Sequence, residues 1–370
     1  MMKDAVHPDG STDFLPAQLT QADFEKLTRS MEKNQTFLVA DHASTGCLLS
    51  SRLNLRDAPR HNEGAARYGP YHRNNKEKTN MYLVMGITGN VGGATARHLL
   101  KQGKQVRALV RDREKAAKWA DQGVELVEGN WNDATAIATA LKGVEGAFVM
   151  LPAVWAPSPD YREAKGVIAN YVEALTKVVP SRVVALSSMG ADRTSGLGMI
   201  TGLALLEQGF RSLPSPVAFV RAGGFFENFL FGLQAAQGGT LPVFYNPTNR
   251  KSTMVASDDI GAEVATLLTG PAWSGQRVIE LGSMVSADEV AAHLGEVLKL
   301  DVRAFALPRA AWAEAFQQFG VPKGHTGPAE ELYESVNAGW MDLGVAGTEH
   351  VAGTTSAHDV FAAAQNAVKA

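Results

Sequence analysis

The sequence lacks most features of exported, membrane-spanning or nucleic-acid-binding proteins. Its 370 residues include a single cysteine, Cys47, which excludes an internal disulfide bond and a cysteine-rich metal site. No apolar run approaches the roughly 20 residues that a membrane span requires, and the first ten residues have no apolar segment typical of a secretory signal. The net charge of −3 gives no general attraction to nucleic acid or acidic membranes. We therefore expect a cytoplasmic protein that binds a small molecule, with no metal, membrane or nucleic acid involved.

The first 80 residues differ in composition from the rest of the chain. The segment 13–38 has apolar residues spaced for one or two short amphipathic helices, whereas 52–80 is polar and typical of a linker or a disordered region. Two explanations stay open: translation naturally starts at Met81 and 1–80 is an upstream extension, or 1–80 is a genuine accessory segment. We treat 1–80 as a largely irregular N-terminal extension and 81–370 as the folded unit.

From Met81 onward, apolar strand-like runs alternate with helical periodicity, which is typical of βαβ units and a parallel sheet. The pattern predicts six strands, at 82–86, 105–110, 125–128, 146–151, 182–187 and 217–221. It places helices between them, at 91–102, 113–122, 133–141, 161–178 and 200–212. The expected fold class is α/β: a Rossmann-type doubly wound parallel sheet over about 81–222, with a smaller C-terminal α/β lobe over about 223–370.

The lobe is expected to cap the carboxyl edge of the sheet, where ligands of open α/β sheets bind. Its pattern predicts a helix that ends near 237 and further helices at 257–268, 286–298 and 310–319. Extended segments are predicted at 240–246, 277–281 and 302–307.

Three glycines form the clearest functional motif. Gly86, Gly89 and Gly92 directly follow the first predicted strand and open the first helix of a βαβ unit. Glycine lets the backbone approach a ligand closely, and the N–H groups at a helix N-terminus bind phosphate. This context, more than the glycine spacing itself, predicts a site for a dinucleotide pyrophosphate.

The end of the second predicted strand bears on the choice of nucleotide. Arg111 lies where the 2′-phosphate of NADP would be bound, and Lys115 is one helical turn further on. A guanidinium can bind a phosphate through two parallel hydrogen bonds. Asp112 is close enough to bind the ribose of NAD instead. We favour NADP(H) over NAD(H).

The expected nicotinamide end of the site lacks a conventional proton donor. Residues 178–250 include no lysine and no histidine, and their only tyrosine is Tyr245. Tyr161 and Lys165 have the spacing of a short-chain dehydrogenase pair, but they precede the fifth strand, so we interpret the spacing as coincidental. Reduction of a simple carbonyl is disfavoured because it needs an acid beside the forming alkoxide. A quinone or a conjugated dye fits better, because its delocalised system accepts hydride and water supplies the proton afterwards.

The sequence resembles the NmrA-like family of atypical short-chain dehydrogenases. Four segments carry the resemblance: 86–93 (GITGNVGG), 106–112 (VRALVRD), 183–192 (VVALSSMGAD) and 221–228 (RAGGFFEN). The resemblance covers about Met81 to the C-terminus and implies NADP(H) in the cleft of a Rossmann core. The family includes NAD(P)H-dependent quinone, azo-dye and triphenylmethane-dye reductases, and regulators that bind the nucleotide without turnover. Many relatives have an aspartate at the position of Asn130, and the isoflavone-reductase branch uses a lysine after the fifth strand that this chain lacks.

Together these observations predict an NAD(P)H-dependent oxidoreductase that reduces a quinone-like or conjugated aromatic acceptor. The alternative is a redox-sensing regulator that binds NADP(H) and a partner protein; an isomerising enzyme would need a proton-transfer residue that we do not find. No catalytic residue or oligomeric state is assigned. The expected nucleotide contacts are Gly86, Thr88, Gly89, Asn90, Val91, Gly92, Arg111, Lys115, Asn130, Trp131, Leu151, Pro152 and Ser187. The expected acceptor contacts are Ser188, Phe225, Phe226, Asn228 and Tyr245, although the phenylalanines could equally pack in the core.

Overall fold

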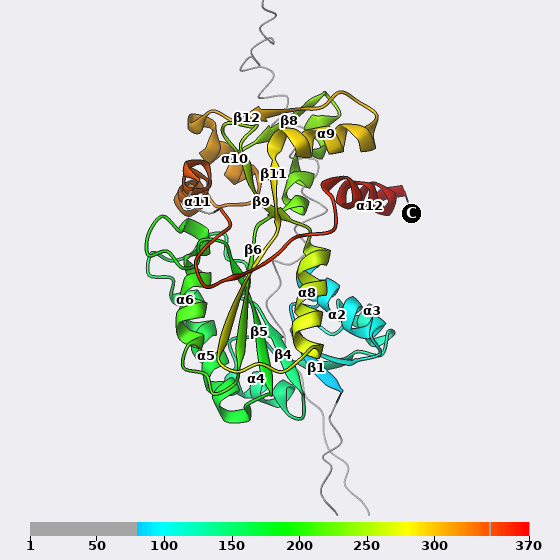
Figure 1. Ribbon diagram of the computed structural model, residues 1–370, viewed down its shortest axis with the longest axis vertical. Helices are drawn as coiled ribbons and strands as arrows, with labels where there is room; N and C mark the ends of the chain where they lie inside the picture. The colour runs from blue at the N-terminus through cyan, green and yellow to red at the C-terminus, as the bar shows by residue number, and fades with distance from the viewer. Residues whose placement is uncertain (1–79, 340–341, 370) are drawn as a thin grey trace, which may run out of the picture.

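The computed structural model describes residues 80–339 and 342–369, and its framework is an eight-stranded sheet (Figure 1). The strands lie in the order β3-β2-β1-β4-β5-β6-β10-β13, and every neighbouring pair is parallel. Successive strands β1 to β3 are added toward one edge of the sheet and the strands from β4 onward toward the other. Open α/β sheets bind ligands at the point where this order reverses, here between β1 and β4. The bounds are β1 Met81–Met85, β2 Gln105–Val110, β3 Glu125–Glu128, β4 Gly146–Val149, β5 Arg182–Ser188, β6 Val217–Ala222, β10 Gln276–Leu281 and β13 Glu349–Val351. The predicted fold class, a Rossmann-type doubly wound sheet, is confirmed.

Helices cover both faces of this sheet (Figure 1). One face is covered by α2 (Asn90–Lys101), α3 (Ala117–Ala120) and α8 (Ser257–Thr269), and the other by α4 (Ala134–Leu141), α5 (Arg162–Val178) and α6 (Thr201–Phe210). The inner strands are therefore buried on both sides, and for this reason they are apolar almost throughout rather than alternating with polar residues.

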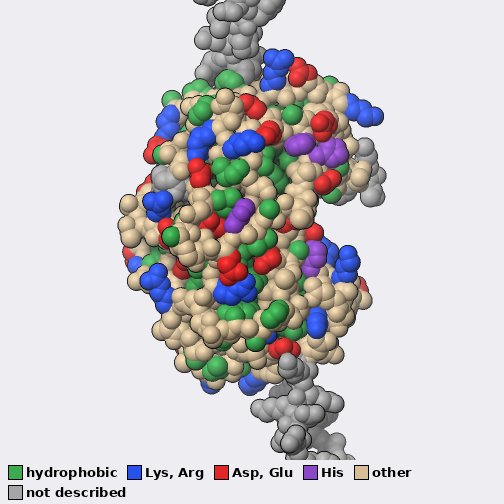
Figure 2. Space-filling model, viewed as in Figure 1, with side chains coloured by type: hydrophobic (Ala, Val, Ile, Leu, Met, Phe, Trp, Pro, Cys, Tyr) green, Lys and Arg blue, Asp and Glu red, His purple; other side chains and the backbone are tan. Residues whose placement is uncertain are grey.

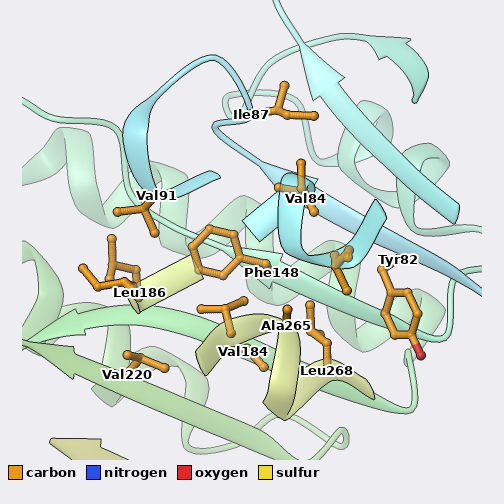
Figure 3. Packing of buried hydrophobic residues seen from close by; sticks show 14 of the residues in the cluster. Tyr82, Val84, Ile87, Val91, Phe148, Val184, Leu186, Val220, Ala265 and Leu268 are labelled. Atoms are coloured by element: carbon orange, nitrogen blue, oxygen red, sulfur yellow. The ribbon is translucent and has the colours of Figure 1, made fainter. Parts of the chain in front are cut away.

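A buried apolar cluster lies beneath the turn that follows β1. Figure 3 shows the Phe148 ring of β4 among Val84 of β1, Val91 of α2 and Leu186 of β5. Phe148 and Val84 are fully buried, and each such side chain contributes about 1.5–3 kcal/mol to stability. This cluster fixes the carboxyl ends of the central strands and hence the turns that leave them.

The predicted β–α order is confirmed, and the largest error in this half is the length of the second helix. The prediction placed it over 113–122, whereas α3 spans only Ala117–Ala120. Asp112 Oδ1 accepts hydrogen bonds from the backbone N–H groups of Glu114 (2.9 Å) and Lys115 (3.2 Å), which forms a turn before the helix. Gly123, with φ of +86°, then ends it.

A second lobe lies beyond the carboxyl edge of the sheet, at the top of Figure 1. It contains a three-stranded sheet in the order β11-β9-β7 and a two-stranded sheet of β12 and β8. Its strands are β7 Gly224–Phe225, β8 Thr240–Val243, β9 Lys251–Val255, β11 Ser283–Ser286 and β12 Arg303–Ala306. Its helices are η3 Phe226–Gly232, α7 Leu233–Ala236, α9 Ala287–Leu298, η4 Arg309–Ala311, α10 Trp312–Gln318, α11 Gly327–Ala338 and α12 Ala357–Lys369.

The segment predicted to be a helix ending near 237 is mostly a 3₁₀-helix. In a 3₁₀-helix, residues three apart share one face, and Phe226 and Phe229 are both buried by this arrangement. Both phenylalanines enter the core of the lobe.

The boundary expected near residue 222 does not divide the chain cleanly into the main sheet and the lobe. Strands β10 and β13 and helix α8 come later in the chain, yet they belong to the main sheet and its covering helices. The chain therefore passes between sheet and lobe more than once.

Residues 1–79, including Cys47 and the helices predicted within 13–38, lie outside the described residues. Within the described part, no helix is both long and apolar enough to cross a membrane. Figure 2 shows acidic and basic side chains interspersed over the drawn face.

Candidate functional site

The glycine turn after β1 requires glycine at two of its three glycine positions, 86 and 92. Gly86 has φ of +66°, a conformation that side chains disfavour. A Cβ atom on Gly92 would lie 2.2 Å from the carbonyl oxygen of Gly86, so a larger residue would push the turn and helix α2 apart. Gly89 is the N-cap of α2, and its N–H donates to the Gly86 carbonyl at 2.9 Å. The turn is thus folded tightly against the first turn of the helix.

The N-terminus of α2 is suited to an anion. Thr88, Gly89 and Asn90 are exposed, whereas Val91 is buried in the core beneath them (Figure 3). The first turn has no acidic residue, and the N-cap glycine has no side chain with which to cap the N–H groups. Helix N-termini of this kind bind phosphate through their N–H groups and the helix dipole. The residues present fit a dinucleotide pyrophosphate.

Arg111 and Trp131, from the loops after β2 and β3, lie together. Arg111 Cζ lies 4.6 Å from the centroid of the Trp131 ring, in a cation–π arrangement, and the arginine remains exposed. Lys115 is also exposed. The Asn130 side-chain oxygen accepts a hydrogen bond from the backbone N–H of Asn132 at 2.7 Å. The structure thus places these predicted nucleotide residues on two adjacent loops, after β2 and after β3.

Three further predicted nucleotide residues lie after β4 or near the end of β5. Leu151 and Pro152 are half-buried in the segment after β4. Ser187 is buried at the end of β5, where its hydroxyl donates to Glu207 Oε1 at 2.5 Å. The hydroxyl of Ser187 is therefore engaged within the protein.

Ser187 belongs to a buried ionic network. The Arg221 guanidinium donates from Nε (2.9 Å) and Nη2 (2.7 Å) to the two oxygens of Glu207, and from Nη1 to Asp192 at 3.1 Å. Burial by itself lowers the pKa of Arg221, but the hydrogen bonds to Glu207 and the charges of Glu207 and Asp192 outweigh this and raise it. The network joins β5, β6 and α6 beneath the carboxyl edge of the sheet.

The segment 221–228 is largely structural. Arg221 belongs to the ionic network, and a Cβ atom on Gly223 would lie 2.5 Å from the carbonyl oxygen of Thr253. Glu227 Oε1 accepts hydrogen bonds from the backbone N–H and the hydroxyl of Ser257, which caps the start of α8. These residues fasten the lobe to the sheet and thereby shape the space between them.

Two adjoining cavities occupy that space. The first, which we name the sheet-edge cavity, has a volume of about 290 Å³. It is lined from the sheet side by Leu186, Ser188, Met189, Ala222 and Phe225. The second, the aromatic cavity, has a volume of about 200 Å³ and is lined by Trp155, Phe229, Phe231, Phe244, Phe316 and Phe319. Both are lined by Asn228, Tyr245, Leu332 and Tyr333, so the two cavities meet at these four residues.

The predicted acceptor residues separate into two groups. Ser188, Phe225, Asn228 and Tyr245 all line the sheet-edge cavity. Phe226 lines neither cavity and packs in the core of the lobe, with 4% of its surface exposed.

Helix α11 contributes lining residues that sequence reasoning did not assign. Leu332, Tyr333 and Val336 line the sheet-edge cavity, and the first two also line the aromatic cavity. A signal for this helix was present: Pro328 lies at its start, and these three apolar or aromatic residues have helical spacing.

Tyr161 and Lys165 do not form a dehydrogenase-like pair. The Tyr161 hydroxyl donates to the carbonyl oxygen of Gly198 at 2.7 Å, and Lys165 is exposed on α5. Among the residues that the structure describes, no cluster of histidine, cysteine and carboxylate side chains is arranged to hold a metal ion.

The glycine turn, the loop after β2 and the segment 221–228 all lie within residues 78–339, and these residues match the model of the NmrA-like family. The chain belongs to the NmrA-like family. The match spans every strand of the main sheet except β13, and most of the lobe beside the two cavities.

Several named proteins are similar to this chain in sequence or in structure. The chain is 28% identical over 255 residues to the NAD(P)H azoreductase of Xenophilus azovorans, a match covering 68% of this chain and 86% of that protein. It is 31% identical over 228 residues to a (4-alkanoyl-5-oxo-2,5-dihydrofuran-3-yl)methyl phosphate reductase of Streptomyces griseus, covering 60% and 76% of the two chains. The structure of the NADPH-dependent quinone oxidoreductase QOR2 from Escherichia coli, complexed with NADPH, shares the fold with a TM-score of 0.63. That match has 22% identity and covers 77% of this chain and all of the other.

Proposed function

We propose that this NmrA-like protein is an NAD(P)H-dependent oxidoreductase that reduces a quinone-like or conjugated aromatic acceptor. The observation that carries the proposal is the position of the two cavities: the sheet-edge cavity lies at the carboxyl ends of β5 and β6, in the same sheet whose β1 ends in the glycine turn, and the aromatic cavity adjoins it. A nucleotide bound on that turn would extend along this edge toward the cavities, as in other open α/β sheets.

The residues around the turn fit a nicotinamide dinucleotide. The N–H groups at the start of α2 would hold the pyrophosphate, and Arg111, with Lys115 nearby, would bind a 2′-phosphate. Asp112 is less suited to bind the ribose of NAD, because its Oδ1 already accepts two backbone hydrogen bonds. These contacts support NADP(H) over NAD(H). The bound cofactor supplies the hydride, and the protein supplies position.

The lining of the cavities favours a flat conjugated acceptor. Phe244 and Phe316 stack with centroids 4.2 Å apart, and further aromatic rings surround them. Among the described residues that line either cavity, the only charged side chain is Asp342, and it is paired with Arg250 at 2.6 Å. Such a site can orient an aromatic molecule but offers no lysine or histidine to protonate a simple ketone.

The named relatives support the same class of reaction. The azoreductase and the quinone oxidoreductase act, by their names, on conjugated acceptors, and the relative from Streptomyces griseus is also a reductase. A nucleotide-binding regulator without turnover is less well supported, since these relatives are enzymes.

The test is to mix the purified protein with NADPH and each of a panel of quinones and dyes, and to follow the nicotinamide absorbance. We expect oxidation of NADPH that depends on both protein and acceptor. Tight NADPH binding without turnover of any acceptor would contradict the enzyme and favour the regulator.

A further inference from the structure

The two cavities differ in the chemistry of their walls. The sheet-edge cavity is lined by four residues with aliphatic hydroxyl groups: Ser187, Ser188, Ser252 and Thr253. The described residues that line the aromatic cavity include no serine, no threonine and no charged side chain. A molecule that fills both cavities would therefore place its polar part beside the sheet and an apolar part within the lobe.

The rings of the aromatic cavity come from separate elements of the lobe. Figure 1 shows β8 and α10 beyond the edge of the main sheet. Phe244 follows β8, Phe316 belongs to α10, Phe319 follows α10, and Phe231 belongs to η3. The cavity therefore forms only when these elements come together.

Two of these rings are not fully covered by the protein. Phe244 and Phe316 are buried. Phe231 and Phe319 pack against each other with centroids 4.8 Å apart, yet both are only half-buried, and both line the aromatic cavity. Further apolar contacts are thus open to these two rings, and an aromatic ligand could supply them.

The aromatic cavity has room for one six-membered ring. Its volume is about 200 Å³. A protein cavity of about 150 Å³ with apolar walls binds benzene. Aromatic rings also favour stacked or edge-to-face contact with other rings, which adds to the effect of burial. The walls of the aromatic cavity therefore favour an aryl group over an alicyclic group of similar size.

The junction of the cavities determines how such a ligand would lie. The sheet-edge cavity is at the carboxyl ends of β5 and β6, where the nicotinamide of the proposed cofactor would deliver hydride. The aromatic cavity joins it at Asn228, Tyr245, Leu332 and Tyr333. The ring that is reduced thus belongs in the sheet-edge cavity, and a second ring attached to it would reach past the junction.

We propose that the aromatic cavity is a subsite for an aryl substituent of the acceptor. The preferred acceptor then has two linked rings, a quinone or other conjugated ring in the sheet-edge cavity and an aryl ring among Phe231, Phe244, Phe316 and Phe319. This inference rests on the proposed function, because it divides one acceptor between the two cavities of that site. The contrast between the two walls and the half-buried pair Phe231 and Phe319 carry it.

The kinetic test compares methyl-1,4-benzoquinone with phenyl-1,4-benzoquinone at saturating NADPH. We expect kcat/KM to be roughly 10-fold higher for the phenyl compound, because its ring is buried in the aromatic cavity. Ala315 lines this cavity alone, and in Ala315→Leu the larger side chain should occupy part of it. The preference should then fall to less than about twofold. Phe231→Leu keeps the wall apolar but removes a ring, so the preference should fall to about threefold.

The matched control is Leu203→Ala. Leu203 is half-buried, as Phe231 is, but it lines the sheet-edge cavity alone. Both quinones should be affected alike, so the ratio of their kcat/KM values should stay as in the unchanged protein. The ratio is compared between variants because the two quinones also differ in their own reactivity.

The binding test needs neither nucleotide nor turnover. Calorimetry compares 4-methylphenol, 4-cyclohexylphenol and 4-phenylphenol, none of which accepts hydride. We expect 4-phenylphenol to bind roughly 10-fold more tightly than 4-methylphenol. It should also bind about threefold more tightly than 4-cyclohexylphenol, because only the phenyl ring can stack on the phenylalanines. Ala315→Leu should remove both differences, and thermal unfolding of each variant checks that it is folded.

The outcomes separate this inference from the proposed function. Tighter binding of 4-phenylphenol that depends on Ala315 and Phe231, without turnover of any acceptor, would overturn the proposed function alone. Turnover with equal kcat/KM for the two benzoquinones, or with a phenyl preference that neither Ala315→Leu nor Phe231→Leu reduces, would overturn the aryl subsite alone. Turnover together with equal binding of 4-phenylphenol and 4-cyclohexylphenol would do the same. A protein that neither favours 4-phenylphenol nor reduces any acceptor would overturn both.

Discussion

The phosphate turn and the acceptor cavities are built in opposite ways. The turn consists of backbone: a side chain on Gly86 would strain the chain, one on Gly92 would collide with the Gly86 carbonyl oxygen, and Gly89 is the N-cap of α2. The cavities consist of side chains that come from β5, β6, η3, β8, α10 and α11. A site that depends on glycines can be recognised from their spacing in the sequence. A site lined by side chains from distant elements depends on the completed fold.

The buried network beneath the cavities provides the largest expected effect. Glu207→Ala would leave the Arg221 guanidinium buried with only Asp192 as its carboxylate partner, so we expect a loss of about 3–5 kcal/mol in the free energy of unfolding. Chemical denaturation measures it. Asp301→Ala is the control, since its partner Arg303 is 80% exposed and the change should cost less than about 1 kcal/mol. Equal costs in the two variants would show that burial of the network does not determine its contribution.

The glycine turn should lose stability and nucleotide affinity when a side-chain atom is added to it. Gly92→Ala places a Cβ atom 2.2 Å from the Gly86 carbonyl oxygen, so the turn must move. We expect a loss of about 1–3 kcal/mol in stability. Nucleotide affinity, measured by calorimetry, should fall roughly 100-fold if the contacting backbone shifts by about 1 Å.

The matched control for this change is Gly166→Ala in helix α5. The added Cβ atom would meet nothing within 4 Å, so we expect unchanged nucleotide affinity. Stability should rise by about 0.5–1 kcal/mol, because alanine favours a helix more than glycine does. Normal NADPH binding by Gly92→Ala would remove the glycine turn from the site.

The smallest effect concerns the choice between nucleotides. Arg111→Ala removes the cation expected at the 2′-phosphate, so the dissociation constant for NADPH should rise roughly 10- to 100-fold and that for NADH less than about threefold. Arg113→Ala is the control, because the Arg113 guanidinium donates to the carbonyl oxygen of Leu126 at 2.8 Å. Equal losses for both nucleotides in Arg111→Ala would contradict its assigned role.

The same contrast explains how much could be predicted from sequence. Strands β1, β4, β5 and β6 were predicted because they are buried on both faces and therefore form apolar runs. The glycines marked the turn between β1 and α2. The prediction for 113–122 was too long because the turn made by Asp112 depends on one side chain's hydrogen bonds.

The cavities could be predicted only in part. Ser188, Phe225, Asn228 and Tyr245 were expected near the acceptor because they are polar or aromatic residues of 178–250, the stretch predicted to form the nicotinamide end of the site, and all four line the sheet-edge cavity. Tyr333 could not be placed there, since α11 reaches the cavities only after β8 pairs with β12 and the lobe closes. Phe226 was also expected near the acceptor, but the 3₁₀-helix directs it into the core of the lobe.

The most direct test of the account is a crystal structure of the protein with NADPH. We predict the pyrophosphate against the N–H groups at the start of α2, the 2′-phosphate within hydrogen-bonding distance of Arg111, and the nicotinamide ring facing the sheet-edge cavity. NADPH bound away from the glycine turn, or with its nicotinamide directed away from that cavity, would contradict the account.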